Sequence, residues 1–485
     1  MPRKKKVNDV LHLGLNQLMT HTGKVITFNE EQIEGLNKIR DWLKNGQTFF
    51  TLAGYAGTGK SSIVKKVLDE YRGDVVVSAP THKAVGVIAD LTDKEGKTLQ
   101  SLIGLRPDCE AADFNPNDLQ FKPIADPKIN SYDFVILDEC SMVNSELFHY
   151  IKTLTLNTQT KILFVGDPAQ IPPIGQKISE VFHQSNIEIH WLTKVERQKS
   201  DSPLLPLCDN LRNNLDSVDG SFLRKTNVND KGEGIIFTTD KDEFRKAILE
   251  TFNSESSKNN INFAKVIAWR NKTVMSSNKI IRTALFGKDS DVIENGDTIM
   301  GYRSVRSSNG RYNIIANSMD YKVIDKMDLS INKYGISGYQ VRLREDLPRG
   351  KFKNKDIFII DSNNEDNLHN YAELHDKFKK IGKEKKEIGS WTEYYNFRRQ
   401  NILMKTITKY KNGFDRDKNN IINKDIDYGY AITGHRCQGS TYSYCFILEE
   451  DIRKNSLIKE RNQIFYVSVS RSCILSTVLC NRIDI

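Results

Sequence analysis

Short apolar runs alternate with longer stretches of helical spacing between Phe28 and Trp191. The runs are rich in β-branched and aromatic residues, and each ends at a polar cluster: Phe49–Ala53, Asp74–Ser78, Asp133–Leu137 and Thr160–Val165. This alternation predicts a parallel sheet flanked by helices. Because ligands of such sheets bind beyond the carboxyl ends of the strands, we expect the polar clusters to meet at one edge.

A second segment of the same kind is predicted from about residue 191. Its strands are expected at Lys265–Trp269 and Tyr444–Leu448, and a further apolar run follows at Tyr466–Val469. Between the two parts the character changes to β-like runs: Tyr321–Ile324, Tyr339–Leu343 and Asp356–Ile360. We interpret residues 318–424 as a module inserted into the second α/β domain.

A charged, aromatic stretch from Leu368 to Tyr410 completes this module and is expected to form solvated helices. Its cluster Trp391–Phe397 fits either the core of a small helical hairpin or a contact surface, and we favour the core. The expected organisation is a basic N-terminal tail (1–27), a first α/β domain (28–190), the two parts of a second (191–317 and 425–485) and the insert (318–424).

The strongest chemical signal follows the first predicted strand. Gly54-Tyr-Ala-Gly-Thr-Gly-Lys-Ser61 matches the phosphate-binding loop pattern in full, and a helix-like segment follows it. Glycines let backbone N–H groups converge on phosphate oxygens, Lys60 neutralises the outer phosphates, and the Ser61 hydroxyl suits Mg²⁺. The expected nucleotide-binding residues of this loop are Gly54, Gly57, Thr58, Gly59, Lys60 and Ser61.

Later strand ends carry groups suited to the same reaction. Asp138-Glu139 suits a second magnesium contact through Asp138 and a water-activating carboxylate at Glu139, the alternative being a helix-capping acidic pair. Gln170 ends another strand, where its amide is placed to bond a γ-phosphate or its attacking water; the alternative is a proline-rich turn. Arg197 and Arg471 offer fixed positive charge, although composition alone makes each a surface arginine.

Composition narrows the setting. The 485 residues include 71 Lys and Arg against 62 Asp and Glu, so the net charge of +9 mildly indicates a polyanionic partner. The seven cysteines form no C-x-x-C pair, which argues against structural zinc or secreted disulfides. We therefore expect a cytoplasmic location, which for a viral protein is the cytoplasm of the host. No apolar stretch is long enough for a membrane span, so no membrane association is expected.

The motifs keep a fixed order from about Phe28 to Ser472. The series is Gln32, Gly54–Ser61, Ala79–Ala84, Thr98–Leu102, Asp138–Met142, Gly166–Gln170, Arg197, Thr433–Gly439 and Arg471. It resembles the motif set of superfamily 1B helicases, above all the phage Dda type, with RecD-like enzymes as cousins. The resemblance implies an α/β fold with two RecA-like P-loop domains, each on a parallel sheet, and an inserted SH3-like β-barrel that carries a helical extension.

The same resemblance implies an ATP- and Mg²⁺-dependent DNA helicase. Such an enzyme translocates 5′ to 3′ on single-stranded DNA and separates forked duplex, here in phage DNA replication or recombination. ATP would bind between the two RecA-like domains, with Gln32 on adenine and Gly439 beside the nucleotide. The groups that would sense or stabilise the γ-phosphate are Gln170, Arg197, Gln438 and Arg471.

A third set of residues would touch DNA, mainly its phosphates. These are Thr81, His82, Lys83, Thr98, Ser101, Thr433, His435 and Arg436. For Thr98 and Ser101, helix capping is an equally good interpretation. Arg436 stands where the family usually has lysine, which keeps the charge and changes the geometry, and Cys140 stands where a small apolar residue is more common.

Strand separation requires a wedge, which this family places between the Thr98 region and Asp138. Residues 105–130 fill that interval, and Phe114 and Phe121 are its aromatic residues. We expect Phe121 to stack on the terminal base pair, because it lies in a β-compatible run; burial beneath the first domain is the alternative.

Two competing hypotheses remain. Phosphate contacts do not exclude a 2′-hydroxyl, so one competitor is an RNA-tolerant translocase. A regulator of replication assembly could also keep the nucleotide-binding fold as a switch without unwinding, although the full hydrolytic set argues against it. The family's habits suggest a single-strand-binding protein as a partner and action as a monomer.

Overall fold

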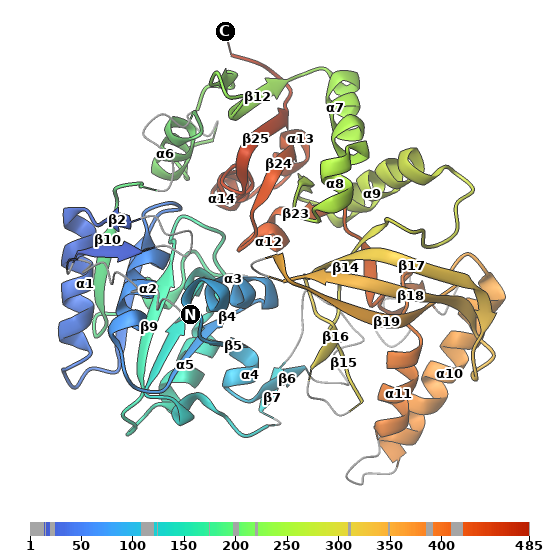
Figure 1. Ribbon diagram of the computed structural model, residues 1–485, viewed down its shortest axis with the longest axis horizontal. Helices are drawn as coiled ribbons and strands as arrows, with labels where there is room; N and C mark the ends of the chain where they lie inside the picture. The colour runs from blue at the N-terminus through green and yellow to red at the C-terminus, as the bar shows by residue number, and fades with distance from the viewer. Residues whose placement is uncertain are drawn as a thin grey trace, which may run out of the picture.

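The computed structural model describes residues 14, 16–19, 25–107, 121–123, 125–173, 175–196, 203–218, 222–308, 312–347, 350–384, 391–408 and 421–484. Figure 1 shows three lobes: a first α/β domain at lower left, a second at the top, and an antiparallel module on the right. No helix in the described ranges is long and apolar enough to cross a membrane.

The first domain is built on a six-stranded parallel sheet in the order β10-β3-β9-β8-β4-β5. Its strands are β3 (Phe49–Gly54), β4 (Val75–Ala79), β5 (Glu95–Thr98), β8 (Phe134–Leu137), β9 (Lys161–Gly166) and β10 (Glu188–Leu192). All four predicted strands are confirmed. Both sheet faces are covered, so the strands are apolar throughout: Phe50 and Leu52 pack on one core, Phe49 and Ala53 on the other.

Helices connect these strands and place the polar clusters at one edge. They are α1 (Glu30–Trp42), α2 (Lys60–Glu70), α3 (His82–Thr92), α4 (Leu99–Leu102) and α5 (Ser145–Leu154), with 3-10 turns at Ile129–Ser131, Cys140–Met142 and Glu180–Phe182. The first domain also contains two small antiparallel strand pairs. They pair β1 (Gln17–Met19) with β2 (Val25–Thr27), and β6 (Leu105–Pro107) with β7 (Phe121–Pro123). The second hairpin lies in the interval expected to supply the wedge.

The second domain carries another six-stranded sheet, in the order β11-β12-β25-β24-β13-β23. Its strands are β11 (Asn227–Val228), β12 (Gly234–Thr238), β13 (Ala264–Ala268), β23 (Ala431–Thr433), β24 (Tyr442–Leu448) and β25 (Ser472–Leu479), parallel except for β11. Its helices are α6 (Leu205–Asn213), α7 (Lys241–Asn253), α8 (Glu255–Asn259), α9 (Asn271–Phe286), α12 (Gly434–Cys437), α13 (Glu449–Ile452) and α14 (Ile458–Val469). The parallel sheets fit the expected pair of RecA-like domains.

One apolar run of this domain is not a strand. Residues Tyr466–Val469 form the last turn of α14, in which every residue from Asn462 onward is buried. A helix that is buried all round has no polar stripe, so its sequence resembles that of a buried strand. The predicted strands at Lys265–Trp269 and Tyr444–Leu448 are confirmed as β13 and β24.

The module on the right of Figure 1 is a five-stranded antiparallel sheet in the order β19-β18-β17-β14-β22. The strands are β14 (Thr298–Gly301), β17 (Asp320–Ile331), β18 (Ser337–Asp346), β19 (Phe352–Ile360) and β22 (Ile426–Tyr428). The three predicted β-like runs are its longest strands, whereas β14 and β22 lie outside 318–424. We therefore propose module boundaries near 298 and 428; an SH3-like barrel stays a prediction.

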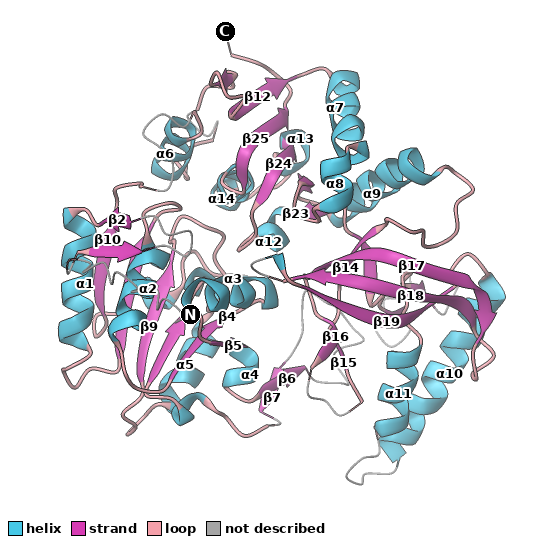
Figure 2. Cartoon of the chain, viewed as in Figure 1, coloured by secondary structure: helices cyan, strands magenta, loops and turns pink. Residues whose placement is uncertain are grey.

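Two helices, α10 (Glu365–Glu384) and α11 (Thr392–Gln400), lie side by side beneath this sheet (Figure 2). The Phe397 ring is fully buried, with its centroid 5.0 Å from that of Tyr371, and Tyr394 is buried beside them. The core interpretation of the aromatic cluster is therefore confirmed. Short hairpins of β15 (Val305–Arg306) with β16 (Asn313–Ile315) and β20 (Ile407–Thr408) with β21 (Ile421–Ile422) complete the lobe.

Candidate active site between the two parallel-sheet domains

The phosphate-binding loop joins β3 to α2 at the carboxyl edge of the first sheet. Gly57 and Gly59 have φ angles of 86° and 84°, a region that favours glycine. The Lys60 Nζ donates hydrogen bonds to the backbone oxygens of Gly54 (2.7 Å) and Tyr55 (2.8 Å). The Thr58 hydroxyl, fully buried, also donates to Tyr55 O (2.9 Å), so side chains within the loop fix its path.

Gln32 supports this loop from the first turn of α1. It forms a reciprocal capping box with Asn29, and its Nε2 donates to the Thr58 backbone oxygen (3.0 Å). A Cβ added to Gly59 would lie 2.3 Å from the Gln32 Nε2, so the helix and the loop need a glycine there. The side chain of Gln32 is buried and its amide is engaged by the protein; its contact with adenine stays a prediction.

Glu139 is the most strongly perturbed acid at this edge. Its backbone takes φ 53°, uncommon for a residue with a side chain. Its side chain makes no capping hydrogen bond to the described turn Cys140–Met142 that it precedes, so the capping alternative is not observed there. Burial and the neighbouring Asp138 raise the pKa of Glu139 to about 7, against the opposing charges of Arg471 and Lys60. Three residues predicted to be catalytic therefore lie within electrostatic reach of one another.

Ser61 and Asp138 are the residues predicted to hold a magnesium ion. Ser61 is the second residue of α2, which follows β3. Asp138 follows β8, and its Oδ1 accepts the backbone N–H of Glu139 (2.9 Å). Mg²⁺ in nucleotide sites prefers hard oxygen ligands and takes one or two from the protein, the rest from phosphates and water. The Ser61 hydroxyl and the Asp138 carboxylate, both at the carboxyl edge of the sheet, are two oxygen ligands of this kind.

Gln170 lies at the end of the segment that follows β9. Its side chain is 5% exposed, and nothing in the described part of the chain donates a hydrogen bond to its Oε1. Its backbone oxygen accepts from the Nε2 of Gln463 on α14 (3.0 Å). The amide oxygen of Gln170 is thus a buried acceptor still able to take a proton donor.

Sequence reasoning missed Asp167, three residues earlier in the same motif. Its carboxylate is fully buried and accepts from the backbone N–H groups of Ala56 (3.0 Å) and Ala169 (2.9 Å) and from the Tyr466 hydroxyl (2.9 Å). Asp167 therefore ties the phosphate-binding loop to α14 of the second domain. The sequence signal that could have identified Asp167 is its place in the polar cluster between Gly166 and Gln170.

The second domain also reaches the tip of the loop directly. Tyr55 and Ala56 pack against the apolar core of that domain, and the Arg212 guanidinium on α6 lies 4.0 Å from the centroid of the Tyr55 ring. The Tyr466 hydroxyl is 3.4 Å from the Ala56 nitrogen. No sequence signal singled out Arg212 or Tyr466, because both are brought to the loop from distant helices.

A further contact across the cleft comes from the segment after α12. The Gln438 Nε2 donates to the Ser141 Oγ (3.0 Å). A Cβ added to Gly439 would lie 3.2 Å from the Cβ of Ala84 and 3.6 Å from a carboxylate oxygen of Glu139. The Gln438-Gly439 turn is therefore seated on the first domain beside the Glu139 carboxylate.

The two predicted arginines differ in what the structure describes. Arg471 is buried, and its guanidinium donates to Val467 O (3.2 Å), Ser440 O (3.4 Å) and Ser470 Oγ (2.9 Å) on its own domain. Arg197 lies outside the described residues. Its neighbour Glu196 donates a backbone N–H to Gly57 O (2.8 Å), which brings the chain just before Arg197 to the phosphate-binding loop.

Lys83, predicted to touch DNA, is engaged at a junction of domains. Its Nζ bonds Asp320 Oδ2 (3.1 Å) on β17, Asn262 Oδ1 (3.3 Å) and the Tyr442 hydroxyl (3.3 Å). Burial would lower the pKa of Lys83, but Tyr442 and Asp320 raise it above its ordinary value. The lysine is charged and its donors are used within the protein.

The neighbouring candidates on the first domain have local roles. Thr81 and Thr98 cap helices by accepting the N–H groups of Ala84 (3.2 Å) and Ser101 (3.4 Å), so the capping interpretation is confirmed for Thr98. Ser101 itself is exposed. His82 lies 3.1 Å, Nε2 to Nδ2, from Asn313 on β16, and burial lowers its pKa.

The candidates around α12 are held by their own domain and by the module. Thr433 is buried before the helix, and the His435 Nε2 lies 3.1 Å from an oxygen of Glu460. The Arg436 guanidinium lies 4.1 Å from the centroid of the Tyr302 ring, and burial lowers its pKa. Flat stacking on an aromatic ring suits arginine better than the lysine usual in the family.

The wedge residue is only partly described. The backbone of Phe121 lies in β7, opposite Pro107 of β6. Its side chain lies outside the described part, as does Phe114, so stacking on DNA stays a prediction.

The chain is similar to several known proteins. The AAA domain family model matches residues 27–223. Uncharacterized protein R530 of Acanthamoeba polyphaga mimivirus is 26% identical over 92% of this chain and 98% of its own length. ATP-dependent DNA helicase dda of Enterobacteria phage T4 is 27% identical over 54% of this chain and 58% of that protein.

The ATP-dependent RecD2 DNA helicase of Deinococcus radiodurans is 29% identical over 36% of this chain and 23% of its own length. The chain thus aligns with little more than half of the phage helicase and a quarter of the bacterial one. The solved Pif1 helicase of Candida albicans has a TM-score of 0.51 and 18% identity, covering 94% of this chain and 95% of that one. At that identity the likeness supports the fold alone.

Proposed function

Because the chain belongs to the superfamily 1B helicases, we propose that it is an ATP-dependent DNA helicase that moves 5′ to 3′ along single-stranded DNA. The observation that carries the proposal is the contact of the second domain with the nucleotide loop of the first. Tyr466 and Arg212 touch the tip of that loop, and Gln438 bonds Ser141 beside Glu139. A nucleotide that shifts the loop would therefore shift the second domain, which is the motion translocation needs.

The chemistry follows from the groups around Glu139. In the proposed reaction, the Glu139 carboxylate accepts a proton from the attacking water, and the free Oε1 of Gln170 orients that water. Lys60, Arg471 and Arg197 stabilise the charge that develops on the γ-phosphate. Ser61 and Asp138 would hold Mg²⁺, which neutralises phosphate charge when bound.

The DNA surface is proposed to run across the tops of both domains and to include Thr81, His82, Lys83, Thr98, Ser101, Thr433, His435 and Arg436. The hairpin of β6 and β7 would separate the duplex ahead of it. Binding of a phosphate by Lys83 would compete with Asp320, which now holds that ammonium group. DNA contact at Lys83 is therefore proposed to loosen the junction between the first domain and the module.

The direction is tested with two partial duplexes that differ only in carrying a 5′ or a 3′ single-stranded tail. We expect ATP-dependent unwinding of the 5′-tailed duplex alone. The Lys60→Ala control should lose at least about 100-fold in rate, since a charge that stabilises the transition state is gone. Preference for the 3′ tail would overturn the polarity while leaving helicase activity in place.

The competing hypotheses are separated by ATPase stimulation with matched DNA and RNA oligonucleotides. The proposal expects turnover that DNA stimulates and RNA does not. Equal stimulation would favour an RNA-tolerant translocase. ATP binding without any nucleic-acid-stimulated turnover would favour an assembly regulator. This test does not address three further proposals: a role in phage replication or recombination, a single-strand-binding partner, and action as a monomer.

A further inference from the structure

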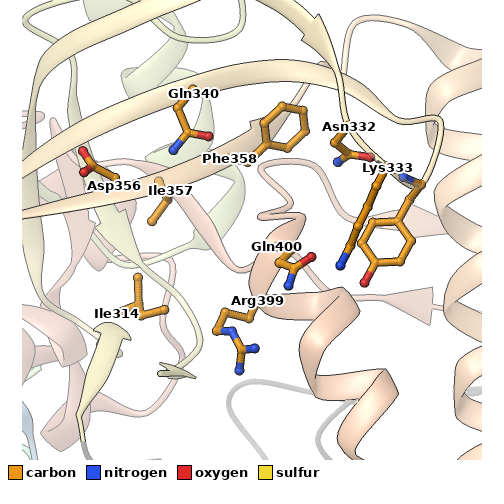
Figure 3. A pocket seen from close by; sticks show the side chains of 10 residues that line it. Ile314, Asn332, Lys333, Gln340, Asp356, Ile357, Phe358, Arg399 and Gln400 are labelled. Atoms are coloured by element: carbon orange, nitrogen blue, oxygen red, sulfur yellow. Dashed lines mark hydrogen bonds between the residues drawn. The ribbon is translucent and has the colours of Figure 1, made fainter. Parts of the chain in front are cut away.

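A cavity of about 360 Å³ lies in the inserted module, between the sheet and the end of α11 (Figure 3). Its chemically distinctive lining comes from three places: the turn between β17 and β18, the strands β18 and β19, and the last residues of α11. Those residues are Lys333, Tyr334, Gln340, Phe358, Arg399 and Gln400. The volume falls within the range of about 300–1,000 Å³ typical of small-ligand sites.

The lining is positively charged. Lys333 is exposed, with its Nζ 5.0 Å from the centroid of the Tyr334 ring, and the Arg399 Nη2 donates to Asn396 Oδ1 (2.5 Å). Neither cation forms an ion pair with a carboxylate among the described residues. Among the described lining residues the one acidic side chain is Asp356, which accepts a hydrogen bond from Arg342 Nε (2.8 Å) and is paired with that guanidinium. Both cations are thus able to bind an anion.

The remaining groups suit a flat, polar ligand. Phe358 and Tyr334 are half-buried aromatic rings, and the amides of Gln340 and Gln400 offer both donors and acceptors. Figure 3 shows these side chains, apart from the unlabelled Tyr334, around one common space. Aromatic faces beside cations are the combination that binds bases and phosphates of single-stranded nucleic acid.

The cavity is next to the first domain. Ile314 on β16 lines it, and the adjacent residue Asn313 contacts His82 at the start of α3. Because successive residues of a strand point to opposite faces, β16 has Ile314 towards the cavity and Asn313 towards α3. A strand of DNA that leaves the proposed track at His82 would therefore meet the cavity after crossing this one hairpin.

We propose that this cavity binds a nucleotide of single-stranded DNA that continues from the N-terminus of α3. Lys333 and Arg399 hold phosphate, the rings of Phe358 and Tyr334 stack on the base, and the two glutamines bond its edge. The site extends the DNA track from the two parallel-sheet domains onto the inserted module. This inference rests on the proposed helicase function and adds a second region of DNA contact to it.

The test is fluorescence anisotropy of the full chain with labelled oligothymidylates of increasing length. The variant carries Lys333→Ala and Arg399→Ala. The matched control carries Lys380→Ala and Lys383→Ala, which remove two exposed charges of α10 away from the cavity. Circular dichroism melts of all three proteins establish that each is folded.

We expect the Lys333/Arg399 variant to bind long oligonucleotides about five- to tenfold more weakly than the parent, and short ones equally well, because only long strands reach the cavity. The slope of log affinity against log salt should also fall by about 1.4 for the long strands, at roughly 0.7 for each phosphate that the variant no longer neutralises. The control should match the parent at every length.

Parent-like affinity and salt slope in the Lys333/Arg399 variant would overturn the cavity proposal. So would a reduction in affinity that is the same at all lengths or is shared by the control, because it would reflect net charge alone. These outcomes leave the proposed function standing when the parent still shows DNA-stimulated ATPase. A parent that binds no single-stranded DNA would instead overturn the proposed function itself.

Discussion

At the scale of single residues, the environment of Glu139 decides when it can act as a base. Its carboxyl is desolvated and lies beside the negative Asp138, and together these raise its pKa to about 7. The left-handed backbone that carries it is also unusual for glutamate. Strained backbone and a perturbed acid at one position are typical of an active site, where charge is placed for reaction instead of stability.

The raised pKa of Glu139 predicts an acidic limb in the pH profile of ATP turnover. Below about pH 7 the carboxyl binds a proton and cannot accept another, so the rate should rise with pH and level off above about 7. The Glu139→Gln variant should turn over about 10²- to 10⁴-fold more slowly and still bind ATP. Steady-state ATPase assays from pH 5.5 to 8.5 measure the limb; a flat profile would remove Glu139 from the role of base.

At the scale of elements, α14 links the second domain to the phosphate-binding loop of the first. Its Tyr466 hydroxyl bonds Asp167, and Asp167 in turn holds the Ala56 N–H of the loop. Gln463 of the same helix bonds the backbone of Gln170. One buried helix thus contacts both the loop that would bind phosphate and the segment that would sense it.

Replacing Tyr466 by phenylalanine should weaken this link while keeping the ring. We expect the ATPase kcat with saturating DNA to fall about tenfold, with the KM for ATP within about twofold, since the change removes a charge-assisted hydrogen bond of about 1.5–3 kcal/mol away from the nucleotide itself. The measurement is ATPase kinetics with and without single-stranded DNA.

Tyr430→Phe provides the matched control for that change. The Tyr430 hydroxyl is also buried and donates to a carboxylate, Asp297 Oδ1 (2.7 Å), but far along the chain from the nucleotide loop. It should lower stability to a similar extent and leave DNA stimulation unchanged. If both variants lose the same fraction of kcat, reduced stability explains the loss. The Tyr466 hydrogen bond then does not couple the second domain to ATP turnover.

At the scale of the whole molecule, Asp320 joins three parts of the chain. It lies on β17 of the module and bonds Lys83 of the first domain (3.1 Å) and the fully buried Lys265 of the second (3.0 Å). Burial would raise the pKa of Asp320, but Lys265 and Lys83 lower it below its ordinary value. One carboxylate therefore balances two cations where the three parts meet.

The Asp320→Asn variant should lose about 3–5 kcal/mol of unfolding free energy, because removing one partner leaves a buried charge uncompensated. Glu255→Gln, which removes the exposed ion pair with Lys258, should cost less than about 1 kcal/mol. Urea unfolding of the full chains at pH 7 compares the two. A decrease below about 1 kcal/mol for Asp320→Asn would mean that the junction does not hold the three parts together.

The pH dependence of the same junction has a definite sign. The pKa of Asp320 is lowered on folding, so its contribution to stability is complete above the unfolded value of about 3.9. The contribution is lost as the pH falls through the lower, folded value. In the Asp320→Asn variant this part of the acid sensitivity should be missing.

The sequence alone determined the strands and the polar groups at their ends. Apolar runs bounded by polar clusters predicted β3, β4, β8 and β9, because a buried parallel strand must be apolar along its whole length. The phosphate-binding loop was equally readable, since its glycines are needed by its own backbone. The strands and the phosphate-binding loop depend on residues that are adjacent in the chain, so they can be predicted from one sequence.

Only the tertiary structure decided the contacts between distant segments. The partner of Lys83, the role of Asp167 and the approach of Arg212 and Tyr466 to the loop depend on how separate elements pack. The run that ends α14 was indistinguishable from a strand because a helix buried on all sides loses its polar stripe. Local patterns specify elements, whereas the pairing of charges and rings across a cleft is set by the packing of the whole chain.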